Sequence, residues 1–303
     1  MPRVLVTGAF GFLGRHVTRR WAQEDWHVTG LGHGDWTRES WRNWGVDDWH
    51  MAEVTLDTLA TYGGEPDVIV HCAGSGSVSF SVIHPYQDFQ RTTLTTAAVL
   101  EYVRLHSPHT RVVFPSSAAV YGVVNRLPIA ETAALAPVSP YGVHKRLAEE
   151  LCQSYANTFK LQVSIVRFFS LYGLGLRKQL MWDACCKLAT GEARFAGTGN
   201  ELRDWIHVTD AAELLACAAT RAGQDCPVFN GGSGRPITVQ EVVSRLSLMF
   251  PGVPALFTGD VRPGDPHQYQ ADVSRTHALG WRPLVELDDG IAEYGEWYKA
   301  GAK

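Results

Sequence analysis

The sequence of 303 residues has no hydrophobic run that approaches the length of a membrane span, which takes roughly 18 consecutive apolar residues. It also has no excess of one charge, because 27 basic residues face 31 acidic ones and the formal net charge is −4. A nucleic-acid binder that depends on bulk positive charge is therefore excluded. We expect neither a membrane nor a nucleic acid as a partner. The N-terminal residues lack the layout of a signal peptide, so we expect a cytoplasmic location.

The six cysteines also lack the spacing of a disulfide framework or a metal site. The six cysteines form no CxxC pair, and none clusters with histidine at the spacing of a zinc site. We therefore expect reduced thiols rather than a disulfide framework, and no bound metal. No internal repeat is visible either. The length and the 45% of hydrophobic residues indicate a globular protein with a sizeable core.

What the sequence does contain is an alternation of short β-branched runs and helical patterns. Glycine and proline become denser after residue 170. The alternation predicts an α/β fold of the Rossmann type with a doubly wound parallel sheet, and the later segment predicts a smaller C-terminal α/β lobe that binds the substrate. The expected strands are residues 4–7, 27–31, 67–72, 111–115 and 163–169, and the expected helices are 12–23, 87–105, 140–159 and 209–220.

A glycine-rich turn, TGAFGFLG, follows the first expected strand. Gly8 permits the tight turn, Gly11 lets the backbone approach a pyrophosphate, and Gly14 lets the helix pack on the strand. The GxxGxxG spacing is a variant of the dinucleotide fingerprint. It predicts cofactor contacts at Gly8, Phe10, Gly11, Phe12, Leu13 and Gly14. We expect an NAD(P)-binding domain at residues 1–169 with a return segment at about 204–229, and a substrate-binding lobe at 170–203 and 230–303.

The second expected strand ends in Leu31-Gly32-His33-Gly34 and lacks the acidic residue that would bind the adenosine ribose of NAD. Gly32 leaves room for a 2′-phosphate, which His33 or Arg38 could meet. We therefore expect NADP in preference to NAD. If Gly32 reflects only a tight turn, either cofactor binds.

A tyrosine, a lysine and a serine form a candidate catalytic group. Tyr141 and Lys145 lie four residues apart in an expected helix, so their side chains share one face. A free tyrosine has a pKa of about 10, and a nearby ammonium lowers it towards the range of a useful acid/base. Ser117 follows the strand expected at 111–115, and ligands bind at the carboxyl ends of parallel strands.

Five segments together resemble a known family. TGAFGFLG, SSAAVYG, YGVHK, RDWIHVTD and RPGDPHQYQAD are similar to motifs of the extended short-chain dehydrogenase/reductase family, and within it to the nucleotide-sugar epimerase/dehydratase group. The resemblance implies that Tyr141 is the acid/base, that Ser117 positions the substrate oxygen, and that Lys145 holds the nicotinamide ribose and tunes Tyr141. It also implies a homodimer formed through the helices at 87–105 and 140–159.

The same resemblance implies the remaining contacts. On the cofactor side, these are Glu53 and Val54 at the adenine, together with Ala73, Gly74, Thr92 and Phe168. On the substrate side, Arg203 and Arg262 contact the diphosphate, Ser81 touches the sugar, and Phe195 either packs on the nucleobase or belongs to the core. Ser117, Ala118, Ser170 and Lys178 complete the substrate set, although Arg177 and Lys178 also fit a solvated turn.

The sequence departs from the group in places. Its 4,6-dehydratases carry an Asp-Glu pair where this chain has Ala118 and Ala119. Alanine cannot move a proton, so 4,6-dehydration is not expected. Ser170 and Thr92 stand where many relatives have asparagine, which leaves the contacts at these positions open.

The residues predict an NAD(P)-dependent oxidoreductase that acts at C4 of a nucleotide-diphosphate sugar. Our first interpretation is reduction of an NDP-4-keto-(6-deoxy)hexose, with Tyr141 as the acid. The alternative is an NDP-hexose 4-epimerase with tightly bound NAD, which needs nearly the same residues. A non-enzymatic NAD(P)-sensing protein is a minor alternative, and the presence of both Tyr141 and Lys145 argues against it.

Tryptophan is concentrated at the N-terminal end. Six of the ten tryptophans fall within the first 49 residues. Four of them, Trp36, Trp41, Trp44 and Trp49, follow the second expected strand, beside the expected adenosine end of the cofactor. They either wall off the cofactor or pack a long connection, and we favour packing.

Overall fold

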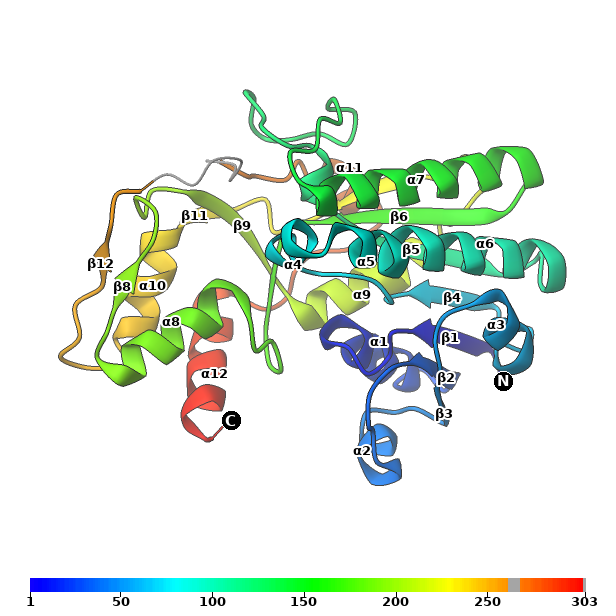
Figure 1. The fold of residues 1–303 in the computed structure, drawn as a ribbon, viewed down its shortest axis with the longest axis horizontal. Helices are drawn as coiled ribbons and strands as arrows, with labels where there is room; N and C mark the ends of the chain where they lie inside the picture. Colours follow the sequence, from blue (N-terminus) through cyan, green and yellow to red (C-terminus); the bar gives the residue numbers. More distant parts are fainter. Residues whose placement is uncertain (261–267, 302–303) are drawn as a thin grey trace.

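A seven-stranded parallel sheet forms the centre of the computed structural model, which describes residues 1–260 and 268–301. The strand order is β10-β6-β5-β4-β1-β2-β3 (Figure 1). This order reverses direction between β1 and β4, which is the topological switch point of a Rossmann-type sheet. The predicted fold class is therefore confirmed. The strands are β1 (Arg3–Thr7), β2 (His27–Gly32), β3 (Asp48–Met51), β4 (Val68–His71), β5 (Arg111–Ser117), β6 (Gln162–Phe168) and β10 (Val228–Gly231).

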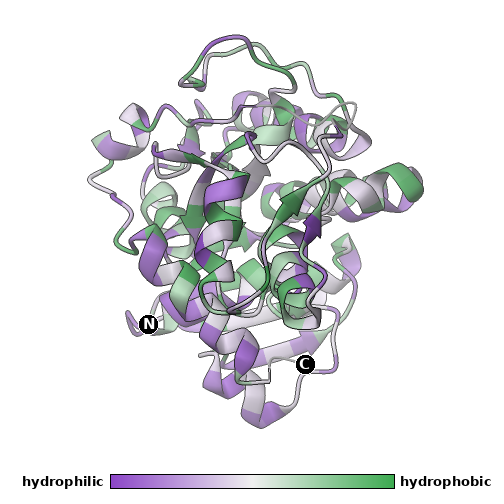
Figure 2. Cartoon of the chain, turned by 90° about the vertical axis from the view of Figure 1, so that its left-hand side faces the viewer, coloured by the Kyte–Doolittle hydropathy of each residue, from purple (hydrophilic) through white to green (hydrophobic). Residues whose placement is uncertain are grey.

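Helices cover both faces of this sheet. Alternate residues of β1 point to opposite faces, so Val4 and Val6 join the core under α1 and α9, whereas Leu5 joins the core under α3, α6 and α7. Figure 2 shows hydrophobic residues along the inner strands and hydrophilic ones mostly at the periphery. The helices are α1 (Phe12–Ala22), α2 (Arg38–Asn43), α3 (Leu56–Tyr62), α4 (Val78–Ile83), α5 (Pro85–Phe89), α6 (Thr95–His106), α7 (Pro140–Phe159) and α9 (Val208–Ala219).

The helix expected at 87–105 is interrupted. A π-helical segment, η1 (Gln90–Leu94), joins α5 to α6. Threonine hydroxyls bond to backbone carbonyls around it, Thr95 to Arg91 at 2.6 Å and Thr96 to Thr92 at 2.7 Å. Single π turns inside α-helices occur frequently at functional sites, and Thr92 lies in this one.

The segment after β6 builds a smaller body beside the sheet, at the left of Figure 1. Two short sheets, of order β11-β9-β7 and β12-β8, pack with helices around a core that includes Tyr172, Met181, Leu246 and Tyr294. The elements are β7 (Ser170–Tyr172), α8 (Gln179–Thr190), β8 (Arg194–Phe195), β9 (Leu202–His207), β11 (Pro236–Thr238), α10 (Val239–Ser247), β12 (Leu256–Phe257) and α12 (Leu287–Lys299). The short helix α11 (Ser274–Ala278) packs instead on β10 of the large sheet, where Thr276 donates to the carbonyl oxygen of Asn230 at 2.6 Å.

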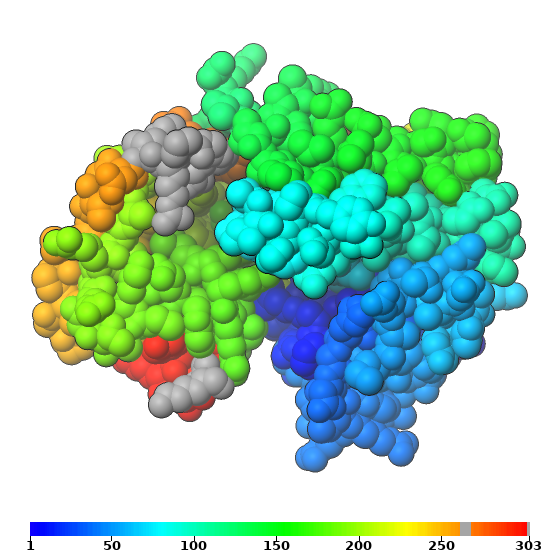
Figure 3. Space-filling model, in the orientation of Figure 1, coloured from blue at the N-terminus to red at the C-terminus, as the bar shows by residue number. Residues whose placement is uncertain are grey.

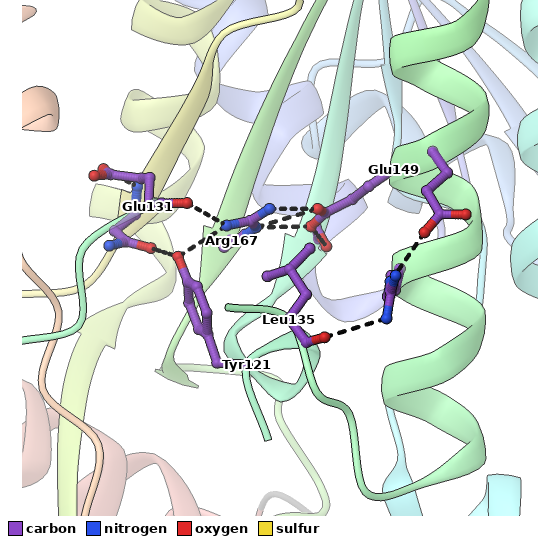
Figure 4. A network of polar contacts seen from close by, with 9 residues as sticks. Tyr121, Glu131, Leu135, Glu149 and Arg167 are labelled. Atoms are coloured by element: carbon purple, nitrogen blue, oxygen red, sulfur yellow. Dashed lines mark hydrogen bonds and ion pairs between the residues drawn. The ribbon is translucent and has the colours of Figure 1, made fainter. Parts of the chain in front are cut away.

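A buried ion pair fixes α7 against the sheet (Figure 4). Arg167 of β6 donates to Glu149 of α7 at 2.7 Å, and both side chains are almost fully buried. Ser116 of β5 donates to the same carboxylate at 2.5 Å, and Tyr121 accepts from Arg167 at 3.1 Å. Because Glu149 lies one turn beyond Lys145, this network sets the position of the α7 face that carries the candidate catalytic residues.

All six cysteines are free thiols. Within residues 1–260 and 268–301, no helix is long and apolar enough to cross a membrane, and no group of histidine, cysteine and carboxylate side chains could hold a metal ion.

Candidate active site

The glycine-rich turn packs tightly between the ends of β1 and β4. Gly8 has a φ of +68°, and a Cβ there would lie 2.6 Å from the backbone nitrogen of Ala73. A Cβ at Gly14 would collide with the carbonyl oxygen of Gly8. The helix α1 begins at Phe12 after Gly11, whose missing side chain caps none of the first N–H groups. These free donors and the positive end of the helix suit an anion, so the turn fits the pyrophosphate of a dinucleotide.

Three predicted residues converge at the switch point. A Cβ built on Gly74 would lie 3.7 Å from Oγ1 of Thr92 and 4.0 Å from Nζ of Lys145. Thr92 is buried, and its hydroxyl accepts a hydrogen bond from the N–H of Ser75 at 3.3 Å. The loop after β4, the π segment and α7 therefore meet beside the glycine turn.

The catalytic candidates Tyr141 and Ser117 come together at the carboxyl end of β5. Tyr141 lies in the first turn of α7, where Ser139 caps the helix and Pro140 opens it. Burial raises the pKa of Tyr141, a hydrogen bond with Ser117 lowers it, and the charge of Asp88 raises it. The expected lowering of this pKa by Lys145 is not found, because Lys145 is not among the groups that shift it and burial has the largest influence.

Lys145 is buried and is held by the backbone of β5. Its Nζ donates to the carbonyl oxygen of Pro115 at 2.9 Å and lies 4.8 Å from the ring centroid of Phe114. Burial lowers the pKa of Lys145 to about 8, although the groups of Cys72, Asp88 and Glu149 oppose this shift. The side chain is therefore still mostly protonated at neutral pH.

A second buried pair beside these residues was missed by sequence reasoning. Asp88 of α5 is fully buried, and its Oδ2 lies 2.6 Å from Nδ1 of His144, the residue before Lys145. The sequence carries no local signal for it, because the other residues of α5 are exposed or half-buried and Asp88 resembles a surface aspartate. The pair joins α5 to α7 within the helical turn that runs from Tyr141 to Lys145.

Several predicted cofactor residues surround the end of β2 and β3. Gly32 is buried against the turn, because a Cβ on it would lie 3.2 Å from the Cα of Gly8. His33 and Arg38 are exposed, and Arg38 is the first residue of α2. Glu53 is exposed, whereas Val54 is buried in the core under α3.

Ser81 is held between α4 and the start of α7. Its side chain is fully buried, its hydroxyl donates to the carbonyl oxygen of Val78 at 2.7 Å, and it accepts from the N–H of Tyr141 at 3.0 Å. Because these bonds join the backbone of α4 to that of Tyr141, Ser81 fixes the start of α7 against α4. The structure gives Ser81 a supporting role beside Tyr141, and its expected contact with the sugar stays a prediction.

The predicted substrate residues line a cavity of about 520 Å³ in the smaller body. Ser170, Phe195 and Arg203 meet there. Phe195 is buried and packs on Phe257 with ring centroids 5.6 Å apart, with Lys187 over its ring. Sequence reasoning missed other lining residues, which include Gln179, Asp183, Glu201 and Trp205. Arg262 lies outside the described residues.

The two parts of the molecule approach each other across a hollow. Figure 3 shows this hollow between the smaller body and the helices at α4, with the first residues of the chain, in dark blue, at its floor. Lys178 reaches over it, because its Nζ lies 3.4 Å from the carbonyl oxygen of Gly76 in the loop after β4. Of the other predicted residues, Ala118 is buried beside Tyr121, and Phe168 is buried against Gly231.

Known proteins resemble the chain along its length. The sequence model of the NAD dependent epimerase/dehydratase family matches residues 4–232. The chain is 32% identical to the UDP-glucose 4-epimerase of Azospirillum brasilense, over 96% of this chain and 90% of that protein. It is 30% identical to a dTDP-glucose 4,6-dehydratase of Actinoplanes sp., over 98% of each. The structure of MoeE5 in complex with UDP-glucuronic acid and NAD superposes with a TM-score of 0.86 at 27% identity, over 98% of this chain and 99% of that one.

Proposed function

Since the chain belongs to the NAD dependent epimerase/dehydratase family of nucleotide-sugar enzymes, we propose that it is a nucleotide-sugar 4-epimerase that uses NAD. One observation carries the proposal: Tyr141 lies in the first turn of α7, four residues before Lys145, whose Nζ is held by the Pro115 carbonyl of β5. Ser117 at the end of β5 lies close enough to lower the pKa of Tyr141. Sequence reasoning placed reduction of a 4-keto sugar first, but relatives with at least 30% identity include two UDP-glucose 4-epimerases and a dehydratase, which favours the alternative.

The dehydratase relative does not lead to the same activity here. Elimination in that group uses an acidic pair after the active-site hydroxyl residue, and this chain has Ala118 and Ala119 in the 3₁₀ turn η2 (Ala118–Val120). Ala118 is buried against Tyr121. Neither methyl group can donate or accept a proton. Elimination of the dehydratase kind is therefore not proposed. Proton transfer at the C4 hydroxyl requires only Tyr141, which is present.

Each catalytic candidate has one proposed task. Tyr141 takes the proton of the C4 hydroxyl and returns it after the sugar has turned over. Ser117 holds the same oxygen by a hydrogen bond, and Lys145 orients the cofactor ribose from its place on α7, where its Nζ bonds to Pro115 of β5. The glycine-rich turn and Lys145 would hold NAD, which would supply the hydride acceptor and donor for C4. Because burial raises the pKa of Tyr141, its acceptance of a proton depends on the groups that lower this pKa.

The substrate is proposed to lie in the cavity of the smaller body. Arg203 suits the diphosphate because a guanidinium forms paired hydrogen bonds with phosphate oxygens, and Arg262 is proposed for the same group. Phe195 offers an aromatic wall for the nucleobase, and Ser170 and Lys178 lie on the sugar side. This assignment makes residues 1–169 and 204–229 the cofactor part, with 170–203 and 230–303 as the substrate part.

We also propose a homodimer in the cytoplasm. Apolar side chains stay exposed on neighbouring helices, with Leu94 at 48%, Leu105 at 48%, Val143 at 40% and Leu147 at 37% of their full exposure. Leu94 ends η1, Leu105 lies in α6, and Val143 and Leu147 lie in α7. Covering them would bury apolar surface against a second copy.

Ser117→Ala tests the link between the serine and the tyrosine. Removing the hydrogen bond that lowers the pKa of Tyr141 leaves less of the proton-accepting form at neutral pH. We expect kcat/KM at pH 7 to fall roughly 10- to 100-fold and the acid limb of its pH profile to move to higher pH. Ser117→Thr keeps the hydroxyl and should restore the limb. An unchanged limb in Ser117→Ala would contradict the assignment.

The proposed function is tested by product analysis without added coenzyme. Purified protein is incubated with UDP-glucose, UDP-N-acetylglucosamine or UDP-glucuronic acid, and the products are separated by anion exchange and identified by NMR. The proposal expects the C4 epimer of at least one substrate. A 4-keto-6-deoxy product would indicate a dehydratase. Consumption of NADPH with a 4-keto sugar, and no epimerisation, would indicate the reductase.

A further inference from the structure

The last residue of β2 is a glycine, so this position offers no acidic side chain to the adenosine ribose. Gly32 lies against Gly8, and His33 points to solvent. In a Rossmann-type fold the ribose hydroxyls lie between this strand end and the glycine-rich turn, and an acidic residue normally selects NAD there. The following inference rests on the proposed use of a nicotinamide dinucleotide. It concerns which residue selects between NAD and NADP in the absence of that acid.

Three aromatic side chains, Phe10, Trp36 and Trp49, pack together beside the end of β2. The ring of Phe10 lies so close to Gly34 that a Cβ on the glycine would overlap it. Phe10 packs edge-on against Trp36 at 5.5 Å between ring centroids, and Trp36 packs against Trp49 at 5.3 Å. Trp36 is 7% exposed, and its Nε1 donates to Oγ of Ser40 at 3.0 Å. The position of the Phe10 ring is therefore fixed from one side by a packed indole.

A guanidinium lies on another side of the same ring. Cζ of Arg15 is 5.1 Å from the ring centroid of Phe10 and 5.4 Å from that of Trp44. Its Nη2 donates to the carbonyl oxygen of Phe10 at 2.6 Å, and its Nε is buried without a hydrogen-bond partner among the described residues. In residues 1–260 and 268–301, no carboxylate forms an ion pair with Arg15. Burial and the neighbouring charge of Arg177 lower the pKa of Arg15, which agrees with a cation that lacks a counterion.

We propose that Phe10 is the cofactor-selecting residue: its ring separates the Arg15 guanidinium from the ribose position and thereby selects NAD against NADP. A 2′-phosphate at the end of β2 would lose its hydration against an aromatic ring, and such a loss is unfavourable unless a cation replaces it. The 2′-hydroxyl of NAD is neutral, so placing it beside the ring costs much less desolvation free energy. The tryptophans after β2 then serve to hold Phe10 in place, which gives part of the N-terminal tryptophan cluster a function besides packing.

The proposal makes a gain-of-binding prediction. Phe10→Ala removes the ring and opens Arg15 to the ribose position, where a guanidinium forms charge-assisted hydrogen bonds with a phosphate. Full-length protein, freed of any nucleotide that copurifies, is titrated calorimetrically with NAD and NADP, and with ADP-ribose and 2′-phospho-ADP-ribose, which lack the nicotinamide. We expect the wild type to bind NAD at least about 10-fold more tightly than NADP, and Phe10→Ala to shift this ratio at least about 10-fold towards NADP.

Two further variants identify the cause. Phe10→Leu keeps an apolar barrier and should keep the preference for NAD, which controls for loss of packing. The double variant Phe10→Ala/Arg15→Gln should lose the gain for both phosphorylated probes. The inference is overturned if the wild type binds NADP as tightly as NAD, if Phe10→Ala weakens all four probes in parallel, or if the double variant keeps the gain.

These experiments distinguish a failure of the role proposed for Phe10 from a failure of the proposed function. If the titrations behave as expected but no sugar is epimerised at C4, the proposed function is refuted and the role of Phe10 stands. If the sugar is epimerised but the Phe10 variants do not alter the NADP to NAD ratio, the role of Phe10 is refuted and the proposed function stands.

Discussion

Tyr141→Phe is expected to lower kcat for C4 epimerisation by roughly 10³-fold, because a positioned acid/base group contributes about 10² to 10⁴ to a rate. The substitution removes only the phenolic oxygen, whose pKa the neighbouring Ser117 lowers. Lys145 keeps its bond to Pro115, so the cofactor position should be preserved. Steady-state rates, together with the amount of NAD that copurifies, separate loss of chemistry from loss of binding.

The same helix offers a matched control. Tyr155 also lies on α7, but its hydroxyl donates to Glu101 at 3.1 Å, away from the candidate site. Tyr155→Phe should retain a rate close to that of the wild type. A Tyr141→Phe enzyme with more than about a tenth of the wild-type kcat would show that Tyr141 is not the acid/base.

Glu149→Ala is expected to cost about 3–5 kcal/mol in the free energy of unfolding, because it leaves a buried guanidinium without its partner. Arg167 is 3% and Glu149 1% exposed, and the two are joined by paired hydrogen bonds (Figure 4). Ser116 also loses the acceptor of its hydroxyl. Urea unfolding, followed by circular dichroism, measures the difference directly.

The neighbouring residue provides the comparison. Glu150 pairs with Arg146 at 2.9 Å, and both side chains are about half exposed. Such a surface pair contributes roughly 0–1 kcal/mol, so Glu150→Ala should have little effect. Replacing both partners of the buried pair, as Glu149→Leu/Arg167→Met, should recover much of the loss, since apolar side chains need no counterion. Equal costs for Glu149→Ala and Glu150→Ala would contradict the assigned importance of the buried pair.

Local patterns in the sequence were sufficient for the elements that carry the main site. The first strand, the glycine turn and α1 follow one another without a break, so a turn motif with its flanking periodicity predicts all three. The helix expected at 140–159 has the bounds of α7, because Ser139 and Pro140 are local start signals. Tyr141 and Lys145 then share a face by helical geometry alone.

Other features depend on contacts that a local pattern does not contain. β3 has the sequence DWHM, in which polar residues of an edge strand hide the usual apolar run. β10 joins the sheet beside β6 after the chain has passed through the smaller body. The pairing of Asp88 with His144 joins residues 56 positions apart, and the burial of Ser81 follows from the packing of α4 on α7. Sequence reasoning had no means to find these contacts.

The hydrogen at C4 of the sugar gives the most direct test of the proposed chemistry. UDP-glucose that carries deuterium at C4 is incubated with the enzyme in ordinary water, without added coenzyme, and the C4 epimer is isolated and examined by mass spectrometry and NMR. Our account predicts an epimer that keeps the deuterium at C4, because the same hydride leaves and returns within one active site. Exchange of the deuterium with solvent would contradict it, as would the absence of a C4 epimer from UDP-glucose, UDP-N-acetylglucosamine and UDP-glucuronic acid alike.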